Sequence, residues 1–172
     1  MAKIVFLDEY SLGGNDLSSI ESLGEYIGYD RTTPEQVLER SKGATVIITN
    51  KVYISRETML QLPDLKLIAI SATGMNNVDL QAAAELGIEV KNVSGYSTYS
   101  VAEATLCDAL SLLKNSTYYD NYFKSGEYAK ADKIFNFDRP TAQLRGKRWG
   151  IIGLGNIGRE VARLAEAFGC TV

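Results

Sequence analysis

The chain has 172 residues, of which 45% are hydrophobic and 23% are charged, and its formal net charge is −3. Acidic and basic residues are mixed without a basic patch, so nucleic acid and anionic membranes are poor candidate partners. No apolar stretch has the length of a membrane span, and the N-terminus lacks a signal-peptide pattern, which predicts a cytoplasmic protein. Histidine is absent, so the commonest general acid–base group and the commonest metal ligand are missing, and no metal site is predicted.

The first hundred residues alternate between short apolar runs and helical patterns. Five runs are predicted to be strands, at 3–8, 25–29, 44–49, 65–71 and 88–92. Helices are expected between them, with N-terminal caps at Thr32 or Thr33 and at Ser55, and with Gly87 ending the helix that starts near Asp79. Repeated β–α units with continuous apolar strands favour a parallel sheet covered by helices on both faces. Residues 1–99 are therefore predicted to form a flavodoxin-like α/β domain.

A longer helical pattern opens at Ser100 and continues towards Tyr122 or Phe123. Residues 124–141 are polar and aromatic and are expected to form a connecting loop. A strand is predicted at 147–152, followed by a glycine-rich turn and a helix over 159–168. Residues 100–172 are thus expected to hold a crossover helix and the first β–α unit of a Rossmann-type domain, which is incomplete in this chain.

The glycine-rich turn reads Gly153-Leu154-Gly155-Asn156-Ile157-Gly158. Between a strand and a helix, the first glycine of such a motif allows a tight turn and the second lets the backbone approach a pyrophosphate. The third allows close packing of helix and strand, and the helix N-terminus offers free N–H groups to the anion. An ordinary strand–turn–helix without a ligand remains the alternative. The acidic residue that would hold the ribose, about 20 residues further on, would lie beyond Val172, so NAD is expected but NADP stays open.

Three further segments carry a second signature. They are Ala72–Leu80 (ATGMNNVDL), Gly87–Asn92 (GIEVKN) and Ser97–Glu103 (STYSVAE). Together with the glycine turn, they resemble the D-isomer-specific 2-hydroxyacid dehydrogenases over essentially the whole chain. Within that family the glycerate dehydrogenase, or hydroxypyruvate reductase, branch is the most similar. The resemblance implies two α/β domains, with 1–99 as the N-terminal part of the substrate domain and 100–172 as the start of the NAD(P)-binding domain.

The resemblance also implies site residues. Backbone N–H groups of Thr73, Gly74, Met75 and Asn76 would bind the substrate carboxylate, with an ordinary glycine turn as the alternative. Thr98 and Val101 would lie near the nicotinamide end of the cofactor. Lys51, after the third predicted strand, is a candidate to attract a carboxylate, although a solvated surface lysine is an equally good interpretation.

The implied activity is reversible hydride transfer between NAD(P)H and a small 2-keto or 2-hydroxy acid, such as hydroxypyruvate, glyoxylate or glycerate. The family's catalytic Arg, Glu and His are expected downstream of the glycine turn, so no catalytic residue is assigned and the chain alone is expected to be inactive. The family is usually homodimeric, which predicts a homodimer for the intact enzyme. The alternatives are a dinucleotide-sensing interaction protein, similar to the C-terminal-binding-protein corepressors, and an inactive fragment.

Overall fold

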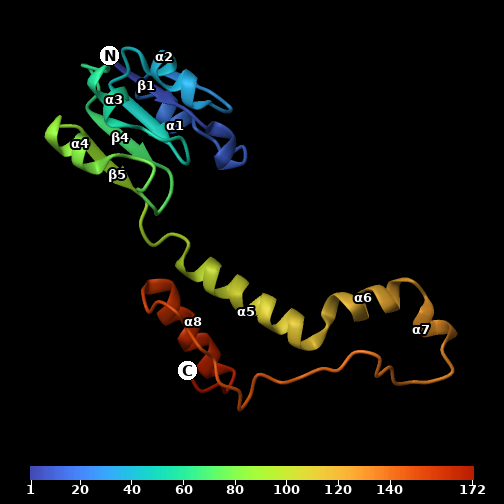
Figure 1. Ribbon diagram of the computed structural model, residues 1–172. Coiled ribbons are helices and arrows are strands. Elements are labelled where there is room, and N and C mark those ends of the chain that lie inside the picture. Colours follow the sequence, from blue (N-terminus) through green and yellow to red (C-terminus); the bar gives the residue numbers. More distant parts are fainter. The chain divides into compact units, whose positions relative to one another are not determined.

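The computed structural model describes residues 1–172, which form two compact units. Unit 1 comprises Met1–Ser94 and unit 2 comprises Gly95–Val172 (Figure 1). The division follows Ser94, whereas the sequence placed it between residues 99 and 100. Residues 95–97, which precede the first helix of unit 2, belong to that unit.

Unit 1 is built on a five-stranded, entirely parallel sheet with the order β2-β1-β3-β4-β5. Its strands are β1 (Ala2–Phe6), β2 (Gly24–Gly28), β3 (Val46–Thr49), β4 (Leu67–Ile70) and β5 (Glu89–Asn92). In register, Ile4 lies between Tyr26 of β2 and Val46 of β3. The order is that of flavodoxin-like sheets, and the predicted α/β fold class is confirmed.

Short helices connect these strands. They are η1 (Glu9–Leu12), α1 (Ser18–Glu21), η2 (Pro34–Gln36), α2 (Val37–Ser41), α3 (Arg56–Leu60) and α4 (Leu80–Glu85). Thr33 forms a capping box with Gln36, and Ser55 accepts a hydrogen bond from the Thr58 N–H. Asp79 caps α4 through the Ala82 N–H, and Gly87 takes a left-handed φ of 71° just beyond the end of α4. These caps satisfy backbone donors that a short helix leaves free.

The two faces of the sheet are covered by different helices. Val5 and Leu7 point to the face covered by α2, α3 and α4, and this larger core is lined by Ile47 and Ile68 of the neighbouring strands. Ile4 and Phe6 point to the opposite face, where residues of η1 and α1 pack on them. Strand residues alternate between faces, and both faces are covered, so the buried part of β1, from Ile4 to Phe6, is apolar at every position.

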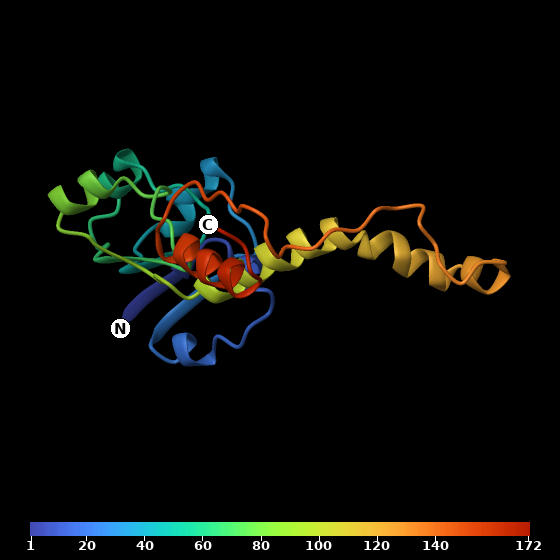
Figure 2. The ribbon, with the colours of Figure 1, turned by 90° about the horizontal axis from the view of Figure 1, so that it is seen from below.

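Unit 2 begins with α5 (Thr98–Lys114), followed by α6 (Ser116–Lys124) and the short α7 (Glu127–Lys130), which falls in the predicted loop. The prediction of one helix running to Tyr122 or Phe123 was wrong, because Asn115 takes a left-handed conformation (φ 50°) that ends α5. Asparagine tolerates this conformation better than most residues. After α7, the chain returns alongside α6 and α5 (Figure 2), and the Asn115 side-chain amide donates to the Pro140 carbonyl across 2.6 Å.

The predicted strand at 147–152 was also wrong. This segment forms only an isolated parallel bridge between Arg148 and Thr171. A strand requires a ladder of several paired residues on a neighbouring strand. Here only Thr171 pairs with the segment, through hydrogen bonds with Lys147 and Trp149. The segment stays separate from the sheet of unit 1, as the sequence indicated.

The last helix of unit 2, α8 (Asn156–Ala167), packs against α5. Its Ala165 is fully buried with Leu144 and Cys170 in a small core that Leu106 and Trp149 help to enclose. This core positions the N-terminal end of α8 against the start of α5. None of the helices combines the length and apolar character needed to cross a lipid bilayer.

Candidate functional site

The glycine turn before α8 has a different structural reason for each of its three glycines. Gly153 has a φ of 95°, which side-chain-bearing residues rarely adopt. A Cβ atom at Gly158 would lie 2.2 Å from the Gly153 carbonyl oxygen, so the turn can close only with glycine there. A Cβ atom at Gly155 would meet nothing within 4 Å. The protein therefore needs Gly153 and Gly158 for its own folding, while the space above Gly155 is left open.

The N-terminus of α8 is open as well. Gly155 is its N-cap residue and has no side chain to accept a hydrogen bond from the first turn. Counted from the start of the helix, the first backbone N–H that donates a hydrogen bond is that of Arg159, which donates to the Gly155 carbonyl across 3.0 Å. The N–H groups of Asn156, Ile157 and Gly158 are left without protein acceptors. Free N–H groups and the helix dipole together favour an anion at this position.

A cavity of about 510 Å³ lies beside this helix end, within unit 2. Its lining comprises Gly95, Thr98, Tyr99, Asn156, Arg159, Glu160 and Arg163. The structure thus brings Thr98 of α5 together with Asn156 of the glycine turn. Val101, one turn further along α5, is 40% exposed but does not line the cavity.

The charges of this cavity were not predicted from the sequence. Arg163 donates to Glu160 across 2.7 Å, and this hydrogen bond lowers the pKa of the Glu160 carboxyl. Arg159 donates from Nε to the Leu154 carbonyl across 3.1 Å, so its guanidinium folds back over the glycine turn. The turn therefore lies beside two arginines, of which only Arg163 is paired with a carboxylate.

Replacing Gly158 by alanine is expected to destabilise unit 2. The added methyl group would overlap the backbone of Gly153, and a backbone atom cannot move aside as a flexible side chain can. Overpacking of this kind typically costs about 1–3 kcal/mol. Thermal unfolding followed by circular dichroism would measure the change. An unchanged transition in Gly158→Ala would mean that the turn is not closed as described.

The loop after β4 is the second candidate site. The start of this loop is held to the end of β5, because the Asn92 side chain donates to the Thr73 carbonyl across 2.6 Å and Thr73 Oγ1 donates to the Val93 carbonyl. From Thr73 onward, none of the backbone N–H groups of residues 73–76 donates a hydrogen bond within the protein. Thr73, Gly74 and Asn76 are exposed. Four free donors at the carboxyl end of a central strand form a suitable cradle for a carboxylate.

Lys51 lies at the carboxyl end of the neighbouring strand, β3. Its backbone N–H and that of Asn50 both donate to the buried Asp8 carboxylate, across 2.6 and 2.8 Å. The Lys51 ammonium forms no ion pair, and it lines a different cavity, which none of the residues 73–76 lines. The Asn77 side chain, directly after this loop, donates to the Asn50 and Val52 carbonyls on either side of Lys51. The structure therefore brings the backbone at Lys51 next to the loop after β4, although Lys51 lines the other cavity. The sequence signal for Asp8 was its position at the end of the first apolar run, where a buried acid requires partners.

The chain was compared with known proteins. Residues 4–168 match the family model described as the catalytic domain of D-isomer-specific 2-hydroxyacid dehydrogenases. A putative 2-hydroxyacid dehydrogenase of Haemophilus influenzae is 42% identical over 99% of this chain and 54% of its own length. The glycerate dehydrogenase of Methylorubrum extorquens is 39% identical over the same shares of the two chains. The crystal structure of a 2-hydroxyacid dehydrogenase from Ketogulonicigenium vulgare has a TM-score of 0.81 and 25% identity, and the match covers 98% of this chain and 52% of that one.

The chain thus spans about half the length of the curated relatives it matches. In each of these comparisons it is covered almost completely, so both units take part in the similarity.

Proposed function

The chain belongs to the D-isomer-specific 2-hydroxyacid dehydrogenases, and on this premise we propose that it provides the substrate loop and the dinucleotide turn of an NAD(P)-dependent oxidoreductase. The reaction proposed is hydride transfer between NAD(P)H and a small 2-keto or 2-hydroxy acid. Hydroxypyruvate, glyoxylate and glycerate are the proposed substrates, because relatives named glycerate dehydrogenase and hydroxypyruvate reductase are 39% and 35% identical to the chain.

The observation that carries this proposal is the open N-terminus of α8. Its free N–H groups lie beside Gly155, above which nothing in the protein lies within 4 Å. A group with a pyrophosphate fits this position, because the backbone can be approached closely and the donors are already aligned. The residues present therefore fit a nicotinamide dinucleotide.

In this proposal Gly153, Gly155 and Gly158 shape the turn, and the N–H groups of Asn156 and Ile157 hold the pyrophosphate. Thr98, which lines the same cavity, and Val101 would contact the nicotinamide end. Hydride transfer is the chemistry that a bound nicotinamide dinucleotide supplies. The protein's own contribution is to bind and orient both reactants, since positioning alone removes a large part of the barrier.

The loop after β4 is proposed to bind the substrate carboxylate through the N–H groups of Thr73, Gly74, Met75 and Asn76. A carboxylate accepts several N–H donors at once, and charge-assisted hydrogen bonds are stronger than neutral ones. Lys51 would act at a distance, by attracting carboxylates to unit 1.

Titration of the protein with NADH, monitored by the fluorescence of NADH, tests the dinucleotide part of this proposal. NADPH titrated in parallel is a second test of the same site, because both dinucleotides carry the pyrophosphate. Competition by inorganic pyrophosphate would place the ligand at the anion site of α8. If neither dinucleotide bound, the glycine turn would be a structural element alone.

Replacing Asn76 by aspartate tests the substrate loop. A carboxylate beside the four free N–H groups should repel the substrate carboxylate and weaken the binding of oxalate or hydroxypyruvate roughly tenfold. Isothermal titration calorimetry would measure the affinity. Asn121→Asp makes the same charge change at an exposed position of α6 and should bind as the unchanged protein does. Equal losses in both variants would point to a long-range charge effect and contradict the assignment of the loop.

We also propose that the intact enzyme is a homodimer. The segment from α6 onward exposes large apolar side chains, among them Phe123, Phe135 and Phe137, which are 56%, 70% and 85% exposed. Clusters of exposed aromatic residues are typical of protein–protein interfaces. Sedimentation of the full-length enzyme at several concentrations would test this proposal.

A further inference from the structure

A cavity of about 580 Å³ opens in unit 1, at the carboxyl ends of β2, β1 and β3. Most of its lining comes from the loops that follow these three strands: Asp8, Tyr10, Arg31, Thr32, Lys51 and Tyr53. β1 and β3 are neighbours in the order β2-β1-β3-β4-β5, and the sheet grows in opposite directions from them. Such a switch point, at the carboxyl ends of the strands, is where open α/β sheets bind ligands. The cavity includes neither the glycine turn nor the loop after β4.

The charges in this cavity favour an anion. The Lys51 ammonium has no ion-pair partner, and Arg31 approaches only Asp30, at 4.0 Å, with both side chains largely exposed. Exposed pairs of this kind contribute little, so both cations remain available to a ligand. The one acid in the lining, Asp8, is 3% exposed and accepts the N–H groups of Asn50 and Lys51. The Asp8 carboxylate is therefore occupied by the backbone N–H groups of the loop after β3.

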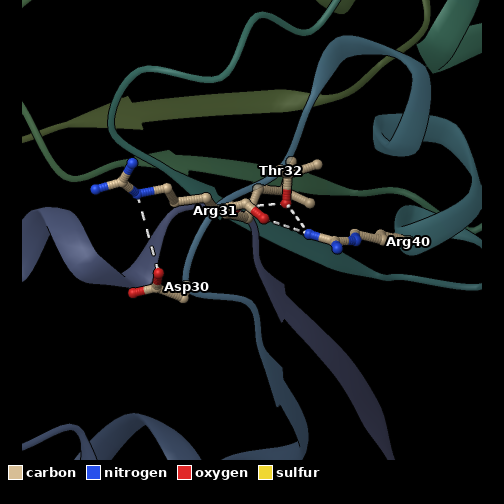
Figure 3. A network of polar contacts seen from close by, with 5 residues as sticks. Asp30, Arg31, Thr32 and Arg40 are labelled. Carbon is tan, nitrogen blue, oxygen red and sulfur yellow. Dashed lines mark hydrogen bonds and ion pairs between the residues drawn. The ribbon is translucent and has the colours of Figure 1, made fainter.

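The wall that carries Arg31 is held in place by hydrogen bonds. Arg40 donates to the Arg31 carbonyl and, across 2.9 Å, to Thr32 Oγ1 (Figure 3). Thr32 Oγ1 in turn donates to the Leu7 carbonyl across 2.5 Å. The Arg31 guanidinium lies over the Tyr10 ring, 4.7 Å from its centroid. A ligand would thus meet a preorganised wall, which reduces the entropy lost on binding.

Most of the remaining lining is apolar or aromatic, and Ser55 and Thr58 add two hydroxyl groups. Tyr10 and Tyr53 are 49% and 58% exposed, and Pro34 and Val37 complete this side of the cavity. The volume lies within the range of about 300–1,000 Å³ that is common for small-molecule sites. Two free cations beside flat apolar surfaces match a ligand with one anionic end and one flat apolar end.

We propose that this cavity binds a small organic carboxylate with a flat apolar body, held by Arg31 and Lys51 and packed against Tyr10 and Tyr53. This site is distinct from the loop after β4. In this proposal, the carboxylate that Lys51 attracts binds in this cavity, at the switch point of unit 1. The inference does not depend on the proposed dehydrogenase activity.

Titration of the isotope-labelled chain with benzoate, followed by NMR, tests the proposal. Benzyl alcohol, which has nearly the same shape and no charge, is the matched control ligand. We expect benzoate to shift the amide signals of Tyr10, Thr32 and Lys51 in a saturable way, and benzyl alcohol to leave them unchanged. Equal binding of the two ligands would overturn the assignment of the cations.

Variants locate the site. Arg31→Met and Lys51→Met should each weaken benzoate binding about tenfold, since each removes a charge-assisted contact. Arg31→Lys keeps the charge and should retain most of the affinity. Lys66→Met removes an exposed lysine just before β4, at the opposite end of the sheet, and should have no effect. Undiminished binding in the Arg31→Met/Lys51→Met double variant would refute the proposal. So would shifts confined to residues 73–76, which would place the carboxylate in the proposed substrate loop instead.

Discussion

Replacing Gly155 by valine is expected to weaken NADH binding roughly 100-fold or more while leaving the fold intact. The backbone at Gly155, with φ −78° and ψ −164°, is one that any residue adopts, and an added Cβ meets no protein atom within 4 Å. The side chain would instead fill the space through which a pyrophosphate approaches the N–H groups of Asn156 and Ile157. Loss of two charge-assisted hydrogen bonds, at about 1.5–3 kcal/mol each, accounts for an effect of this size.

Gly150→Val provides the matched control. Gly150 is also exposed, has open space around its Cβ position and needs no left-handed backbone, but it lies ahead of the turn. Its substitution should leave NADH affinity within about twofold of the original, given the small effect of most surface changes. Fluorescence titration of both variants, with circular dichroism to verify folding, gives the comparison. If Gly155→Val bound NADH as tightly as the unchanged protein, the dinucleotide could not lie over the turn.

The second large effect concerns turnover. The 172-residue polypeptide is expected to reduce neither hydroxypyruvate nor glyoxylate with NADH or NADPH. Reduction of a ketone requires a proton for the developing alkoxide, and this sequence holds no histidine to deliver it. General acid catalysis contributes about 10²–10⁴-fold, and poorer positioning of the two reactants lowers the rate further.

A longer polypeptide in which an Arg, a Glu and a His follow the glycine turn should restore turnover. The absorbance of the reduced cofactor, recorded for both polypeptides at the same concentration, measures the difference. Reductase activity in the short polypeptide would mean that its own residues donate the proton. The candidates to replace would then be the tyrosines nearest the α8 cavity, beginning with Tyr99.

The parts of the fold that follow a periodic pattern were predictable from the sequence. All five strands of unit 1 lie within the predicted runs or within one residue of them. The central strands β3 and β4 were recognisable because buried parallel strands are continuously apolar, whereas the edge strands β2 and β5 also carry charged residues. The cap residues Thr33 and Ser55 were predictable because their side chains act on N–H groups two or three residues away. Asn115 was missed, since its left-handed conformation interrupts a helical pattern that continues unbroken on both sides.

The candidate sites were predictable only in part. The glycine turn and the loop after β4 are contiguous motifs, and the ligand roles given to them stay predictions. The switch-point cavity was not predicted, because it depends on contacts between distant segments. Asp8 binds the backbone of Asn50 and Lys51, and Arg40 fixes the loop of Arg31. Bonds from a side chain to a distant backbone group leave no periodic trace in the sequence.

The strand order of unit 1 has a consequence for how the chain folds during synthesis. β1 is made first but is flanked by β2 and β3, and the pairs Ala2–Gly24 and Ile4–Val46 join residues far apart in sequence. Its fully buried Val5 and Phe6 therefore stay exposed until Thr49 has left the ribosome. From then on, β4 and β5 add to the β3 edge in the order of their synthesis. Because non-local parallel pairing is slow, the nascent chain up to about Thr49 should be the stage most prone to aggregation and most dependent on chaperones.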